Sequence, residues 1–152
     1  MFPVLLQILG ELRKKGEAAK PEMPGPKPRV SPEAAMALTL WLADATGLRL
    51  GVEEISEVLF RLGEEKGYEP PYLAMRRVAG EELFSEDVAG WVGWLIGVGY
   101  TRSHPGDPIE LGKDGIKVCR QVLEDERRFN KELDFLLLAR AILELLQKYQ
   151  PR

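Results

Sequence analysis

One apolar segment, residues 34–45, constrains the fold more than any other part of the chain. If this segment is a helix, it carries alanine, leucine, methionine and tryptophan on nearly every side. A helix that is apolar all round is stable only when other elements surround it. Ser31, Pro32 and Glu33 provide an N-cap, a preformed first helical residue and a charge that favours the helix N-terminus. We therefore expect a central buried helix over residues 31–46, ended by Gly47.

The remaining periodicity predicts a mostly α-helical fold with a small β-hairpin. Further helices are expected at 52–62, at 71–79 after a Pro-Pro break, and at 86–98, where Ser85 is the N-cap and Val88, Trp91, Val92, Leu95 and Val98 are the buried stripe. A strand, a Pro-Gly turn and a returning strand are expected between residues 100 and 111. Helical patterns follow after Gly115 and at 131–149, and the pattern leaves open whether 113–149 is one helix or two.

The ends of the chain differ from its middle. Residues 1–19 predict an amphipathic helix at 2–15, and its apolar stripe is Val4, Leu5, Ile8, Leu9 and Leu12. Residues 20–30 contain four prolines within eight positions, which is typical of an extended linker. We expect a body at 31–128 and a C-terminal helix at 129–152. That leucine-rich helix is expected to dimerise or to pack on its own chain, for instance against residues 2–15.

Composition gives expectations about the compartment and the source. Cys119 is the only cysteine, so no intrachain disulfide is possible. The apolar start is interrupted by charges too early for a secretory signal or a membrane span. We therefore expect a cytoplasmic protein. Abundant Glu and Arg with a single asparagine is typical of a heat-adapted, thermophile protein.

Residues 94–102 (Trp-Leu-Ile-Gly-Val-Gly-Tyr-Thr-Arg) and 108–115 (Pro-Ile-Glu-Leu-Gly-Lys-Asp-Gly) carry a family resemblance. Together with the helix order, they resemble the recognition helix, the wing and the Leu-Thr-x-x-Gly turn of winged helix-turn-helix regulators. Gly112 stands where that turn usually has threonine. The resemblance covers about 31–125, and it implies a winged-helix-like body flanked by an N-terminal helical arm and a long C-terminal helix. It also implies DNA binding through the 86–98 helix.

The residues themselves argue against reading DNA through that helix. Its face opposite Trp91 carries Glu86, Ala89 and glycines, which offer no side-chain donors to base edges. Residues 31–112 hold six Lys or Arg against fourteen Asp or Glu, whereas phosphate binding needs clustered cations. If DNA is bound, the expected contacts are Lys14, Lys15, Lys20, Lys27, Arg29, Arg76, Arg77 and Arg102.

Catalytic and cofactor motifs are not expected. His104 is the single histidine and falls in a Pro-Gly turn, while Cys119 falls on the apolar stripe of its helix. One His and one Cys do not make a zinc site, and the glycines at 86–98 lie within a helix rather than in a phosphate-binding loop. We expect no enzyme, no cofactor, no metal site and no small-molecule site.

Two functions therefore remain open. The first is a non-enzymatic regulatory or adaptor protein that uses a winged-helix scaffold for protein–protein interaction, as a homodimer or with another protein. Its expected interface residues are Gly90, Gly93, Trp94, Gly97, Leu133, Leu137 and Leu145. The second is a dimeric winged-helix transcriptional regulator that binds DNA. The charge distribution favours the first.

Overall fold

The computed structural model describes residues 28–68, 75–77, 83–99, 101 and 108–149. These residues form five helices and one two-stranded antiparallel sheet. The helices are α2 (Pro32–Ala45), α3 (Val52–Lys66), α4 (Glu86–Gly97), α5 (Lys113–Phe129) and α6 (Phe135–Leu146). The mostly helical fold expected from the sequence is confirmed.

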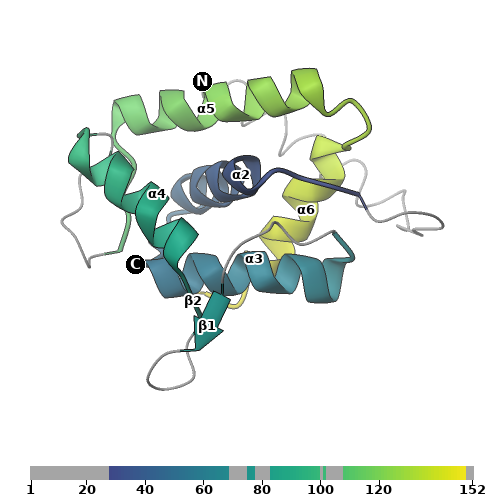
Figure 1. Ribbon diagram of the computed structural model, residues 1–152, viewed down its shortest axis with the longest axis horizontal. Coiled ribbons are helices and arrows are strands. Elements are labelled where there is room, and N and C mark those ends of the chain that lie inside the picture. The colour runs from purple at the N-terminus through teal and green to yellow at the C-terminus, as the bar shows by residue number, and fades with distance from the viewer. Residues whose placement is uncertain (1–27, 69–74, 78–82, 100, 102–107, 150–152) are drawn as a thin grey trace.

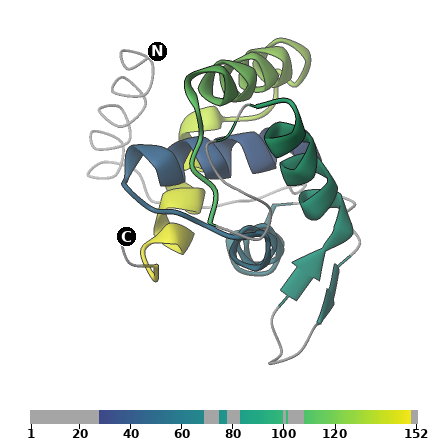
Figure 2. The ribbon, with the colours of Figure 1, turned by 90° about the vertical axis from the view of Figure 1, so that its left-hand side faces the viewer.

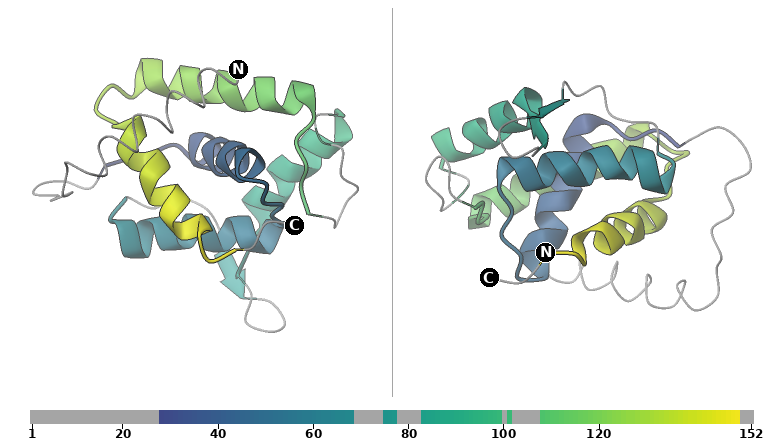
Figure 3. Two further views of the ribbon diagram at one scale, coloured as in Figure 1. Left: turned by 180° about the vertical axis from the view of Figure 1, so that it is seen from behind. Right: turned by 90° about the horizontal axis from the view of Figure 1, so that it is seen from below.

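Helix α2 lies at the centre of the molecule, as its all-round apolar sequence predicts (Figure 1). Every residue from Ala34 to Ala43 is buried. The helix begins where expected, because the Ser31 hydroxyl accepts a hydrogen bond from the Ala34 N–H at 3.2 Å. Helices α5, α3 and α6 pack around it, and Figure 3 shows α6 beside α2 with α5 and α3 on opposite sides.

Helix α3 is longer than predicted. It continues past Gly63, which is buried within it, and ends at Gly67, whose φ of 76° is the left-handed conformation that glycine adopts most easily. Tyr68 then returns to the core, where its N–H donates to the Leu62 carbonyl. Gly63 thus lies inside the helix despite the weak helix propensity of glycine.

The short helix predicted at 71–79 is wrong where the structure describes it. Residues Met75–Arg77 form strand β1, which pairs with β2 (Leu83–Ser85) in the register Met75↔Ser85. The two strands project from the body beyond α3 and α4 (Figure 2). Segments as short as these have no decisive local preference, so pairing with a partner strand decides their conformation.

Ser85 joins this sheet to α4. Its N–H donates to the buried Ser56 hydroxyl on α3 at 3.0 Å, and its own hydroxyl accepts from the Val88 N–H at 3.3 Å. The N-cap predicted for this helix is therefore confirmed. These two bonds attach the start of α4 to α3.

The hairpin predicted at 100–111 lies largely outside the described residues. Its described part is one antiparallel bridge between Thr101 and Leu111. Beside it, the Ile109 N–H donates to the Leu50 carbonyl at 2.8 Å. The segment after α2 and the segment before α5 thus lie side by side.

The structure separates the C-terminal pattern into two helices. Asp134 caps α6 by accepting hydrogen bonds from the N–H groups of Leu136 and Leu137 at 3.0 and 3.2 Å. Helix α6 therefore begins at Phe135 and not at 131. Leu138, Ile142 and Leu145 belong to the same core as α2, so residues 135–146 pack on their own chain.

Candidate interaction surfaces

Helix α4 exposes apolar side chains that a monomer normally buries. Val88, Val92 and Leu95 face the core, but Trp94 and Val98 are each 48% exposed. Val98 was expected on the buried stripe, with Trp91 at its centre. Instead, Trp91 is partly buried, and Val98 is the C-cap residue that follows the last helical residue, Gly97. We call Gly90, Gly93, Trp94, Gly97 and Val98 the α4 surface.

No residue that the structure describes packs against the glycines of the α4 surface. A Cβ atom built on Gly90, Gly93 or Gly97 meets nothing within 4 Å among the described residues, and none of the three has a positive φ. Neither close packing by those residues nor backbone conformation therefore requires glycine here. Glycine inside a helix costs about 1 kcal/mol relative to alanine.

The charges around α4 are acidic. The helix contains no Lys or Arg, and its first turn carries the exposed side chains of Glu86 and Asp87. In a winged helix that turn approaches the DNA groove, where two carboxylates would be repelled by phosphates. The helix carries no Arg, Lys, Asn or Gln side chain that could donate to base edges.

Only some of the basic residues expected to contact DNA lie in the part of the chain that the structure describes. Arg29 is exposed, and its carbonyl accepts a hydrogen bond from the Asn130 side chain at 2.8 Å. Arg76 and Arg77 lie in β1. The other expected contacts, Lys14, Lys15, Lys20, Lys27 and Arg102, lie outside the described residues.

The leucines proposed for a dimer interface lie mainly in the core. Leu133 and Leu145 are 7% and 4% exposed, and Leu137 is partly buried. Leu133 lies before α6, in the turn where its N–H donates to the Asn130 carbonyl. Leu133 and Leu145 therefore stabilise the monomer, and the periodicity that selected them cannot distinguish an interface from a core.

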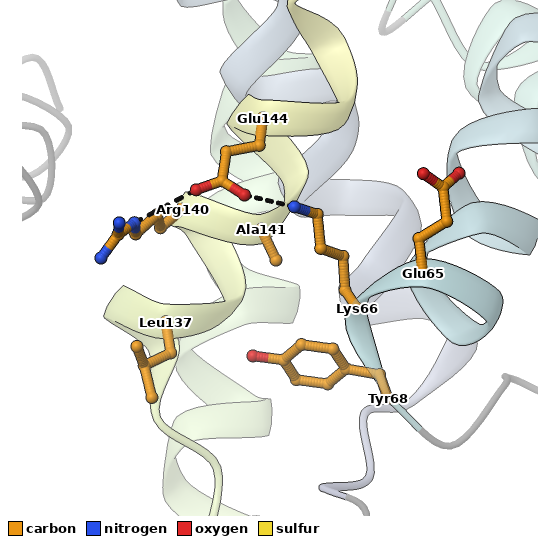
Figure 4. Close-up of a pocket in the computed structure, with 7 residues that line it drawn as sticks. All are labelled: Glu65, Lys66, Tyr68, Leu137, Arg140, Ala141 and Glu144. Atoms are coloured by element: carbon orange, nitrogen blue, oxygen red, sulfur yellow. Dashed lines mark hydrogen bonds and ion pairs between the residues drawn. The ribbon is translucent and has the colours of Figure 1, made fainter. Parts of the chain in front are cut away.

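Sequence reasoning did not foresee a hollow between α3 and α6. This cavity of about 280 Å³ is lined by Glu65, Lys66, Tyr68, Leu137, Arg140, Ala141 and Glu144. Figure 4 shows the Tyr68 ring extending from the end of α3 toward α6. The lining residues come from the end of α3, from Tyr68 just after it, and from α6. These segments are far apart along the chain, so no local motif marks the cavity.

The polar rim of this cavity is held by ion pairs. Glu144 accepts from Lys66 and, at 3.2 Å, from the Arg140 Nε. The bond from Lys66 is the main reason that the pKa of Glu144 lies below its ordinary value. Burial, with a smaller contribution from Asp134, raises the pKa of Tyr68 to about 12. Tyr68 is therefore a neutral phenol at ordinary pH.

Among the described residues that line this cavity there is no Cys, Ser, Thr or His. Cys119 is fully buried, and burial raises its pKa to about 12, which keeps it an unreactive thiol. His104 lies outside the described residues. Within the described part, no group of three or more His, Cys, Asp or Glu side chains is placed to hold a metal ion.

Neither a membrane-spanning helix among the described residues nor a similarity to known proteins indicates the family of this chain. No helix among the residues that the structure describes is both long and apolar enough to cross a membrane. No protein-family model matches the sequence, and neither a curated protein nor a solved structure is detectably similar to it.

Proposed function

We propose that this chain is a non-enzymatic regulatory or adaptor protein that binds another protein chain through the α4 surface of a winged-helix-like body. The observation that carries the proposal is the exposure of Trp94 and Val98 beside glycines that no described residue contacts closely. Large exposed apolar side chains mark interaction sites, and tryptophan is prominent among residues that dominate binding energy.

The order and contacts of the elements support a winged-helix-like body. Helices α2, α3 and α4 are followed by the Thr101–Leu111 bridge and then by α5. The Ile109–Leu50 hydrogen bond adds the segment after α2 to that bridge, which is the position of the first strand in a winged helix. The β1–β2 sheet is an insertion between the second and third helices of this arrangement.

A second copy of the chain is the first partner to test. The α4 surface combines three glycines with two large exposed side chains, Trp94 and Val98, and two such surfaces can complement each other across a two-fold axis. Three glycines on one helix face allow a close approach of two backbones. That contact would offset the helix propensity that the glycines lose.

Sedimentation equilibrium over a wide concentration range tests this directly. We expect wild-type protein to self-associate, Trp94→Ala to weaken the association at least tenfold, and Phe129→Ala to leave it unchanged. Phe129 is the matched control, because it is 80% exposed but lies on α5. A monomer at every concentration, or equal effects of the two substitutions, would reject pairing through α4.

The alternative function is a DNA-binding regulator, and the same winged-helix-like arrangement favours it. A fluorescence-anisotropy titration with generic duplex DNA at several salt concentrations separates the two. We expect no saturable binding even at low salt. Binding with a steep salt dependence that Trp94→Ala leaves intact would establish DNA as the partner instead.

A further inference from the structure

The cavity between α3 and α6 combines an apolar wall with hydrogen-bond donors. Leu137, Ala141 and the Tyr68 ring form the apolar part, and Lys66 and Arg140 carry charged donors (Figure 4). Small-molecule sites have this composition, in which a few polar groups orient a ligand against apolar side chains. The volume of about 280 Å³ is adequate for a small ring, because a protein cavity of about 150 Å³ holds benzene.

The donors of this cavity outnumber the acceptors that its own residues supply. Lys66 and Arg140 both donate to one carboxylate, that of Glu144 (Figure 4). Glu65 is the second carboxylate at the cavity, and it is bound by both the Nε and the Nη2 atoms of Arg61. A lysine ammonium has three N–H donors and a guanidinium has five. The two cations that line the cavity therefore keep donors that neither carboxylate uses.

Two observations single out donors that a ligand would satisfy. The Nη1 atom of Arg140 is shielded from solvent, and no described residue accepts a hydrogen bond from it. A buried donor without an acceptor is rare in folded proteins and needs an explanation. The hydroxyl of Tyr68, a residue only 5% exposed, is bonded to none of the other residues that line the cavity (Figure 4). Burial and, to a smaller extent, Asp134 raise its pKa to about 12, so it remains a donor at ordinary pH.

An anionic group suits these donors better than a neutral or cationic one. The acids that line the cavity or act on Tyr68 are already engaged. Glu65 and Glu144 are in ion pairs, and Asp134 accepts from two N–H groups at the start of α6. Arg140 bonds to Glu144 through Nε, which leaves the edge formed by its two Nη atoms for a second carboxylate. Paired bonds of this kind are among the strong hydrogen bonds in proteins.

We infer that the α3–α6 cavity binds a small organic carboxylate whose apolar body is about the size of one aromatic ring. Arg140 donates to the carboxylate, the Tyr68 hydroxyl provides a neutral donor, and the ring lies against Leu137 and Ala141. No residue of α4 lines the cavity, so the inference goes beyond the proposed function and does not depend on it. It also departs from the absence of a small-molecule site that the sequence predicts.

The test is a titration of the full-length protein with benzoate, followed by amide NMR spectra. We expect saturable shifts that are concentrated at the end of α3 and in α6. Two comparison probes each lack one half of the ligand. Benzyl alcohol keeps the ring without the carboxylate, and acetate keeps the carboxylate without the ring. Each should bind about tenfold more weakly than benzoate, because one of the two kinds of contact is lost.

A matched pair of arginine variants tests the assigned donor. Arg140→Gln should weaken benzoate binding about tenfold, because the charge-assisted bonds are lost. Arg120→Gln is the control and should leave binding unchanged. Arg120 donates from Nε to Glu124 at 3.0 Å in an ion pair with the same spacing, but it lies on α5 and does not line the cavity. Tyr68→Phe should weaken binding by a smaller factor than Arg140→Gln, since it removes a neutral donor.

Several results would overturn the inference. Shifts that grow linearly with benzoate concentration, or that centre on residues away from the cavity, would show that the cavity is not a binding site. Equal binding of benzoate and benzyl alcohol would exclude recognition of the carboxylate. Equal losses in the two arginine variants would remove Arg140 as the donor. The comparison of probes uses the wild-type protein, so it decides the question even if a variant fails to fold.

Discussion

The glycines of α4 allow a quantitative test of how open its surface is. Gly93 lies inside the helix, it does not have a positive φ, and a Cβ at this position meets no described atom within 4 Å. Gly93→Ala therefore adds a methyl group without a described steric contact and removes backbone freedom from the unfolded chain. The difference in helix propensity predicts a stabilisation of about 0.8–1 kcal/mol. Gly90→Ala should add a similar amount.

Urea denaturation followed by circular dichroism at low protein concentration measures this gain. For a chain of this size, about 1 kcal/mol corresponds to a rise of about 2–4 °C in melting temperature. Gly67→Ala is the matched control, because its Cβ also meets nothing within 4 Å but its φ is +76°. The same substitution there should destabilise the protein by about 1 kcal/mol or more, since alanine is strained in that region.

An unchanged or lower stability for Gly93→Ala would refute the reasoning. It would mean that an element packs closely on this face in the isolated monomer. If the gain in stability is accompanied by weaker self-association, the glycines are retained for the partner and not for the fold. Such an exchange of stability for binding is common at functional surfaces.

Three further predictions concern the cap, the ion pairs and the thiol. Ser85→Ala should cost about 1–2 kcal/mol in urea denaturation, because the N-cap bond to the Val88 N–H is lost, and Ser85→Asp should retain more of that stability. The pKa of Glu144 is lowered in the folded protein, chiefly by its bond to Lys66. The ionised Glu144 side chain therefore contributes to folding stability above pH 4.5, and this contribution is lost as the pH falls through the folded-state pKa. Glu144→Gln should flatten this acid limb of the stability profile, and an unaltered limb would contradict the assignment. Cys119 is buried with a pKa of about 12. It should therefore react with a thiol reagent at pH 8 only as fast as the folded protein opens to expose it. Immediate labelling of the native protein would show that Cys119 is not in the core.

Elements whose signals are local could be predicted from the amino-acid order alone. The all-round apolar pattern of residues 34–45 indicates a central position for α2, because no other arrangement removes all of its faces from water. Ser31 and Ser85 mark the starts of α2 and α4, because a hydroxyl that accepts from the N–H three residues later needs only its own segment. The absence of basic residues from α4 is equally clear in the sequence.

Features that depend on distant partners required the packed structure. Residues 75–77 are a strand because residues 83–85 pair with them, and their own propensities are too weak to resist that pairing. Leu133 and Leu145 have the same periodicity as an interface, and only the burial of both side chains in the packed structure shows them to be core. The exposure of Trp94 and Val98 likewise depends on where α4 meets its neighbours, since a hydrophobic pattern gives the face of a helix but not what covers it.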